Sequence, residues 1–133
     1  MTDIDKALRE ARRLIDGGDF SNAVAALEPL AGLSFEAAML AGVAANCAGM
    51  LDRAVDHFTS AIRMSPEHLE ARLNLALTLR ALGRIDDAEA VLCSALGIDA
   101  QSLSVNFALG NLTIQKGSFE EAQGYFSAVL AID

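Results

Sequence analysis

The sequence predicts an all-α fold made of repeated pairs of antiparallel helices, and three observations lead to this prediction. Hydrophobic residues make up 53% of the 133 residues and aromatic residues only 5%, so the apolar content is mostly Ala and Leu, which helices tolerate better than sheets do. The chain has only two prolines, and its glycines are scattered, which argues against an internal flexible linker. Glycine also recurs at one constant interval, at Gly49, Gly83 and Gly117.

The same interval relates the residues that follow each glycine. A large apolar residue comes two positions later, alanine five positions later and Phe or Leu nine positions later. Glycine can end a helix in the left-handed conformation without steric cost, so each of these glycines predicts a helix end. Acidic residues just after each glycine, such as Asp52, Asp86 and Glu120, predict the start of the next helix, because negative charge is favourable at the positive end of the helix dipole.

These signals predict helices at residues 3–16, 20–28, 35–48, 51–64, 69–82, 85–97, 103–116 and 119–131. The first pair is irregular, because its glycine, Gly18, lies closer to Gly49 than the constant interval would place it. Pro29 explains the difference, since proline removes a helix hydrogen bond and disfavours helical geometry in the residue before it. We therefore expect the second helix to stop near Glu28 and a turn to occupy residues 31–34.

The repeated positions resemble the tetratricopeptide repeat, whose unit is about 34 residues long. The second unit reads Ala38, Ala41, Gly42, Ala45, Ala54, Phe58, Ala61 and Pro66. The third reads Arg72, Leu75, Ala76, Leu79, Ala88, Leu92, Ala95 and Ala100. The fourth reads Asn106, Leu109, Gly110, Thr113, Ala122 and Phe126, with Val129 where alanine is usual. The resemblance implies a right-handed superhelix of about four helix pairs, eight helices in all, in a single domain over 1–133 with units at about 4–34, 35–68, 69–102 and 103–133.

No group of residues predicts catalysis. His57 and His68 are expected to be isolated surface histidines, and neither Cys47 nor Cys93 has a histidine at helical spacing that could act as its base. The sequence therefore predicts a protein that is not an enzyme, with no catalytic residue, no cofactor and no metal.

Charge and hydropathy restrict the partners and the location. The net charge is −8, and no run of Lys or Arg is long enough to contact a phosphate backbone, so nucleic acid would be repelled. The uncharged stretch from Ala37 to Leu51 is shorter than the roughly 20 residues of a membrane span. The amino terminus lacks the basic and apolar regions of a secretory signal, and two cysteines fit a reducing compartment. We expect a cytoplasmic protein with a protein or peptide partner.

In tetratricopeptide repeat proteins the first helix of each pair lines the concave face. The resemblance therefore implies a partner-binding groove formed by Arg12, Met39, Val43, Asn46, Leu73, Asn74, Leu77, Arg80, Phe107 and Asn111, with Leu8 and Gln115 beside them. The expected function is a scaffold or adaptor that binds a peptide or helix there, with apolar residues contacting partner side chains and asparagines bonding its polar groups. Each apolar residue has the alternative of packing between helices.

Two other functions stay open. One is the amino-terminal repeat domain of a larger bacterial enzyme, such as a sulfotransferase or glycosyltransferase, and the other is a scaffold that assembles into a homo-oligomer. The last helix carries Tyr125, Phe126 and Val129 and is too apolar to be covered on one side only, whereas the end of a stacked array needs a polar outer surface. We therefore expect this uncapped end either to pair with another copy or to continue into a longer chain.

Overall fold

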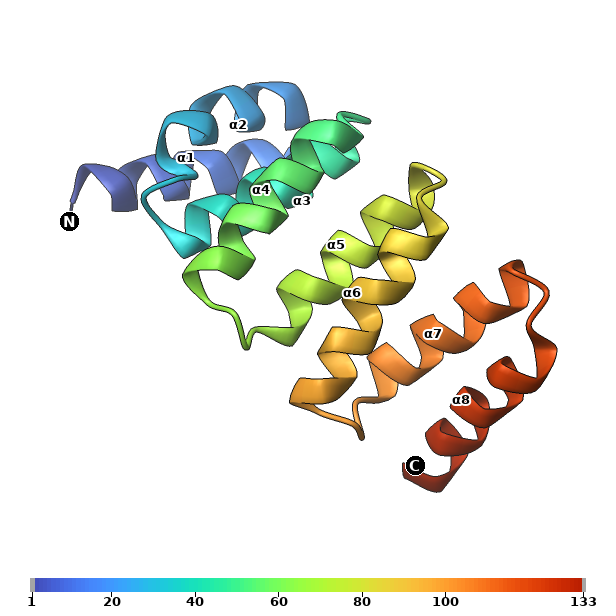
Figure 1. Cartoon of the computed structure of the whole chain (residues 1–133). Coiled ribbons are helices and arrows are strands. Elements are labelled where there is room, and N and C mark those ends of the chain that lie inside the picture. The colour runs from blue at the N-terminus through green and yellow to red at the C-terminus, as the bar shows by residue number, and fades with distance from the viewer. Residues whose placement is uncertain (1, 133) are drawn as a thin grey trace.

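Four antiparallel helix pairs stack side by side along the molecule, from α1 at the blue end to α8 at the red end (Figure 1). The computed structural model describes residues 2–132, and these residues contain no strand. Their helices are α1 (Asp3–Asp16), α2 (Phe20–Leu27), α3 (Phe35–Cys47), α4 (Leu51–Met64), α5 (Leu69–Ala81), α6 (Ile85–Ile98), α7 (Leu103–Gln115), α8 (Phe119–Ile132) and the short 3₁₀ helix η1 (Glu28–Leu30). The predicted right-handed superhelix of antiparallel helix pairs is confirmed.

A left-handed glycine ends the first helix of every pair. The φ angles lie between 78° and 83° at Gly18, Gly49, Gly83 and Gly117, a conformation that an L side chain would strain. After α3, the Met50 N–H donates to the Ala45 carbonyl at 2.8 Å and the Gly49 N–H donates to the Asn46 carbonyl at 3.1 Å. These bonds satisfy carbonyls that the last helical turn leaves free. The predicted helix stops are therefore confirmed.

The first and second helices of a pair begin differently. A side chain caps α3, α5 and α7 by accepting a hydrogen bond from the backbone N–H three residues later, and the capping residues are Ser34, His68 and Ser102. Helices α4 and α6 have no side-chain cap but carry acids in their first turn, as α3 and α5 also do. The dipole of these second helices is thus stabilised by charge.

The irregular first pair follows the expectation from Pro29. Helix α2 ends at Leu27, and the chain tightens into η1 over Glu28–Leu30. The Leu33 and Ser34 N–H groups both donate to the Leu30 carbonyl, at 2.9 and 3.1 Å, and so close the turn that leads into α3.

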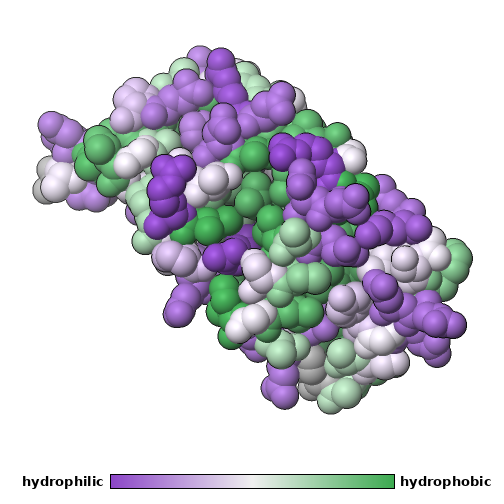
Figure 2. Space-filling view, in the orientation of Figure 1, coloured by the Kyte–Doolittle hydropathy of each residue, from purple (hydrophilic) through white to green (hydrophobic). Residues whose placement is uncertain are grey.

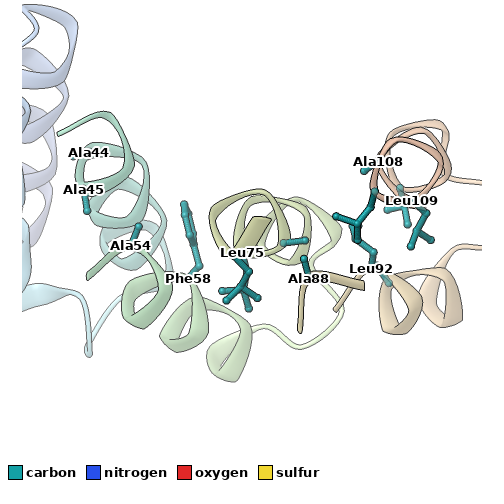
Figure 3. Close-up of a cluster of buried hydrophobic side chains, with 14 of the residues drawn as sticks. Ala44, Ala45, Ala54, Phe58, Leu75, Ala88, Leu92, Ala108 and Leu109 are labelled. Atoms are coloured by element: carbon teal, nitrogen blue, oxygen red, sulfur yellow. The ribbon is translucent and has the colours of Figure 1, made fainter. Parts of the chain in front are cut away.

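The core is continuous from α2 to α7. Alanines lie beside larger side chains such as Phe58 and Leu92 in this core (Figure 3). A Cβ atom added to Gly42 of α3 would lie 2.5 Å from Cε1 of Phe58 in α4. In the next pair the equivalent residues are Ala76 and Leu92. The residue on the first helix is thus larger than Gly42, and the residue on the second helix is smaller than Phe58. The backbones approach closely because one side chain of each pair is small.

Hydrogen bonds from two first helices fasten the turns between pairs. Arg72 donates to the Pro66 carbonyl from Nε at 3.0 Å and from Nη2 at 2.8 Å. Asn106 is the equivalent residue one repeat later, and its Nδ2 donates to the carbonyls of Ala100 at 3.0 Å and Ser102 at 2.9 Å. Both residues occupy the position where the repeat pattern has tryptophan, so a polar clamp replaces an aromatic packing contact.

Candidate peptide-binding groove

The first helices of the pairs form one continuous face, because α1 contacts α3, α3 contacts α5 and α5 contacts α7. At least two hollows lie along this face. The first has a volume of about 430 Å³ and is lined by Arg12, Phe35, Glu36, Met39, Leu40, Val43, His68 and Glu70. The second has a volume of about 580 Å³ and is lined by Leu77, Arg80, Ala81, Asn111, Ile114 and Gln115.

The first hollow has an apolar lining with charged groups around it. The guanidinium of Arg12 in α1 forms an ion pair with Glu36 in α3. His68 is fixed on the opposite side, because its Nδ1 accepts the Ala71 N–H at 3.2 Å and its ring lies 4.7 Å from the ring of Phe35. The imidazole is therefore a helix cap and part of the wall of the hollow.

The second hollow is bridged by a polar contact. Arg80 of α5 donates from Nε to Oε1 of Gln115 in α7 at 2.9 Å. Two apolar side chains beside this contact are open to solvent, with Leu77 42% exposed and Ile114 46% exposed. The hollow thus combines apolar surface with amide and guanidinium groups, which suits recognition of both side chains and backbone.

The predicted groove residues fall into three groups. Arg12, Met39 and Val43 line the first hollow, and a second group, Leu77, Arg80 and Asn111, lines the second hollow. The remaining four line neither hollow and are Asn46, which is exposed, Leu73 and Asn74, which are half-buried, and Phe107, which is exposed.

Phe107 lies toward the carboxyl-terminal end of the array. Its ring is 5.9 Å from the ring of Phe126 in α8, in an edge-to-face arrangement. Leu73 packs against the core cluster, and Leu8 is only 4% exposed and belongs to the core. Phe126 is half-buried, as are the two other residues predicted for self-association, Tyr125 and Val129.

Several lining residues were not predicted. Glu36 and Glu70 lie one repeat apart, at the second position of α3 and α5, so the repeat spacing contained the signal for them. Phe35, Leu40 and His68 also line the first hollow, and Phe35 and His68 lie where a turn joins the start of a helix.

The prediction of a surface His57 is wrong. Its side chain is 13% exposed, its Nε2 is buried, and that atom lies 3.9 Å from Oε1 of Glu28. The irregular segment η1 brings Glu28 over α4, and no repeat spacing describes that contact.

Other possible sites are limited in the part of the chain that the structure describes. Within residues 2–132, no group of three or more His, Cys, Asp and Glu residues is placed to hold a metal ion. None of the helices there has the length and apolar character needed to cross a bilayer. Cys47 and Cys93 are free and exposed.

Comparison with known proteins agrees with the repeat geometry. Residues 48–101 match the family model described as tetratricopeptide repeat. This segment, which contains α4, α5 and α6, has the sequence pattern of that family. No curated protein matches the chain.

Solved structures of MamA share the fold of this chain. One is 22% identical with a TM-score of 0.90, covering 98% of this chain and 78% of that one. MamA of MSR-1 is 25% identical with a TM-score of 0.84, covering 99% and 78% of the two chains. MamA of Desulfovibrio magneticus RS-1, from residue 41 to its end, is 16% identical with a TM-score of 0.88, covering 98% and 75%. The likeness shows that the helix pairs stack in the same way.

Proposed function

We propose that this tetratricopeptide repeat protein is a non-enzymatic scaffold or adaptor that binds a peptide or helix of a partner protein in the groove formed by its first helices. One observation carries the proposal: equivalent apolar residues on successive first helices stay open to solvent. Val43 of α3 is 36% exposed and Leu77 of α5, one repeat later, is 42% exposed. Each lies in a different hollow of the same face.

The two hollows support different contacts. Partner side chains that enter them would bury apolar surface, which contributes about 25 cal/mol per Å² removed from water. In the second hollow Asn111 and the Arg80–Gln115 pair offer donors and acceptors to a partner backbone. This surface fits a partner with two apolar residues, one for each hollow, and with polar backbone groups near the second hollow.

The second helices α4 and α6 lie in front of α3 and α5 in Figure 1, and Figure 2 shows the surface on this side, with hydrophobic side chains over the middle of the array and hydrophilic ones around them. The exposed free cysteines support a reducing, cytoplasmic setting for such an adaptor.

The test begins with peptides selected from a random library on the unmodified protein, whose affinity is then measured by calorimetry. Leu77→Asp should weaken binding by about 1–3 kcal/mol, because it places a charge in an apolar contact. Ala90→Asp on the exposed surface of α6 is the matched control and should leave the affinity unchanged. Circular dichroism should show that both variants keep their helix content.

Selected peptides that bind the Leu77→Asp variant as tightly as the unmodified protein would contradict the groove as the binding site. A library that yields no binder would contradict the adaptor function itself.

A further inference from the structure

The carboxyl-terminal end of the array exposes an apolar surface that we call the end face, formed by Ile114, Phe119, Ala122, Phe126 and Leu130 of α7 and α8. Phe119 is 69% exposed and Leu130 is 77% exposed. A hollow of about 410 Å³ lies between these side chains. Apolar surface gathered in one place on a protein commonly marks an interaction site.

The same positions in the internal pairs are covered. Phe126 is half-buried, whereas its equivalents Leu92 and Phe58 are each 1% exposed. Leu130 is exposed, whereas its equivalents, Leu96 and Ile62, are partly buried against the core. The part of the end face around Phe126 and Leu130 is therefore a surface that this chain covers twice elsewhere in its own fold.

The covering element in both internal cases is the first helix of the next pair. Helix α5 packs on α4, and α7 packs on α6. Helix α5 buries Ala71 and Leu75 in doing so, and α7 buries Val105 and Leu109. In both cases the two buried residues are four positions apart and lie on one side of the helix. A helix that covers the end face should therefore carry two apolar residues four positions apart.

Charge adds a second feature of that helix. Lys116, directly after α7, binds Asp86 at 3.2 Å and Glu89 at 3.1 Å, both on α6. The residue of α8 equivalent to Asp86 is Glu120, which is exposed and is followed by the exposed Glu121. A cation just after the last turn of a docking helix would therefore reach these acids in the same way.

A second copy of the chain fits the end face poorly. Stacking in the same direction would place the exposed charged residues of α1, including Lys6, Glu10 and Arg13, against apolar surface, which is unfavourable. A two-fold pairing of end faces would bring no free cation to Glu120, because Lys116 is held by two acids of α6.

We propose that the end face binds an amphipathic helix of another protein, with two small or branched apolar residues four positions apart and a Lys or Arg at its carboxyl-terminal end. The bound helix takes the place of the first helix of a further pair. Its apolar side covers Phe126 and Leu130, and its cation pairs with Glu120. This surface is separate from the groove, so the proposal goes beyond the adaptor function.

The probe for the test is a labelled peptide of residues 102–116, the α7 segment itself, because α7 already covers the equivalent surface of α6. An isolated helix of this length is only partly formed in water, so weak binding is expected, measured by fluorescence polarisation against the intact protein. Leu130→Asp should lower the affinity at least tenfold, and a peptide carrying Lys116→Glu should also bind less tightly. Ala90→Asp is the matched surface control and should leave the affinity unchanged.

Amide chemical shifts distinguish the possible sites. Binding at the end face should perturb α8, whereas α3 and α5 should stay unchanged. The proposal is wrong if the peptide does not bind, if Leu130→Asp binds it normally, or if the shifts lie in the groove. It is also wrong if ultracentrifugation shows a dimer of the unmodified protein that Leu130→Asp dissociates, because the occupant is then a second copy.

Discussion

Replacing Gly42 by alanine tests the close approach of α3 and α4. The new Cβ would lie 2.5 Å from Cε1 and 2.7 Å from Cδ1 of the Phe58 ring. Phe58 is 1% exposed, so its ring cannot move without displacing other core side chains, and such overpacking costs about 1–3 kcal/mol. Alanine offsets about 1 kcal/mol of this cost, because alanine is more favourable than glycine in a helix interior. The free energy of unfolding should therefore fall by about 1 kcal/mol and by no more than about 2.

Gly110 provides the matched comparison within the same chain. A Cβ there would lie 2.5 Å from Cε1 of Phe126, a contact as short as the one at Gly42. Phe126 is half-buried at the end face, so its ring can rotate toward solvent. The cost of overpacking is then small, and Gly110→Ala should leave the free energy of unfolding unchanged or raise it by up to about 1 kcal/mol.

A second substitution at Phe58 should reverse the effect at Gly42. The third unit already combines Ala76 with Leu92 at these positions, so Gly42→Ala with Phe58→Leu copies a pairing that the fold accepts. The two changes should couple favourably by about 1–3 kcal/mol in a double-mutant cycle. Urea unfolding followed by circular dichroism gives the midpoints and slopes. If Gly42→Ala and Gly110→Ala destabilise the protein equally, the reasoning is refuted, and Phe126 is covered in solution.

Two further predictions concern single side chains. Burial raises the pKa of Tyr125 above its ordinary value of 10.0, and Cys93 adds to the rise; the stability from this group is thus present below pH 10 and is lost as pH rises through the folded pKa. Tyr125 is the only tyrosine, so the ultraviolet absorbance of tyrosinate should appear with a higher pH midpoint in the folded than in the urea-unfolded protein. Cys93→Ser should reduce the difference between these two pH midpoints. Asn106→Ala should lower the free energy of unfolding by about 1–3 kcal/mol, because Asn106 is only 3% exposed and its loss removes bonds to two carbonyls. Arg72→Ala should lower the free energy of unfolding by less than Asn106→Ala, because the hydrogen bonds of Arg72 lie at the exposed surface. An equal fall in both variants, measured by urea unfolding, would contradict this difference.

The fold was predictable because each unit repeats the same backbone requirements. Gly49, Gly83 and Gly117 mark left-handed turns, and such a turn nearly dictates glycine. The constant interval between these glycines then fixes which apolar positions meet, so the helix pairs follow from local signals alone. Even the irregular turn at Pro29 could be predicted, since proline acts on its own neighbours.

The groove was predictable only in part, because its positions differ from one unit to the next. The repeat spacing assigned Val43 and Leu77 to one face, and each lines a hollow there. The spacing did not reveal that Phe107 packs beside Phe126, because the equivalent positions in the other pairs are not both aromatic. His57 was misjudged for a similar reason, since Glu28 reaches it from an irregular segment.

The groove and the end face share a helix and one side chain. Ile114 of α7 lines both the second hollow of the groove and the hollow of the end face. Internal units of a repeat array are stabilised by a neighbour on each side, whereas α7 and α8 receive that stabilisation from one side only. A helix bound at the end face would supply the missing neighbour and hold α7 in place, and Asn111 and Gln115 with it. We therefore expect the order of the second hollow to depend on what covers the end of the array, because both hollows share Ile114 of α7.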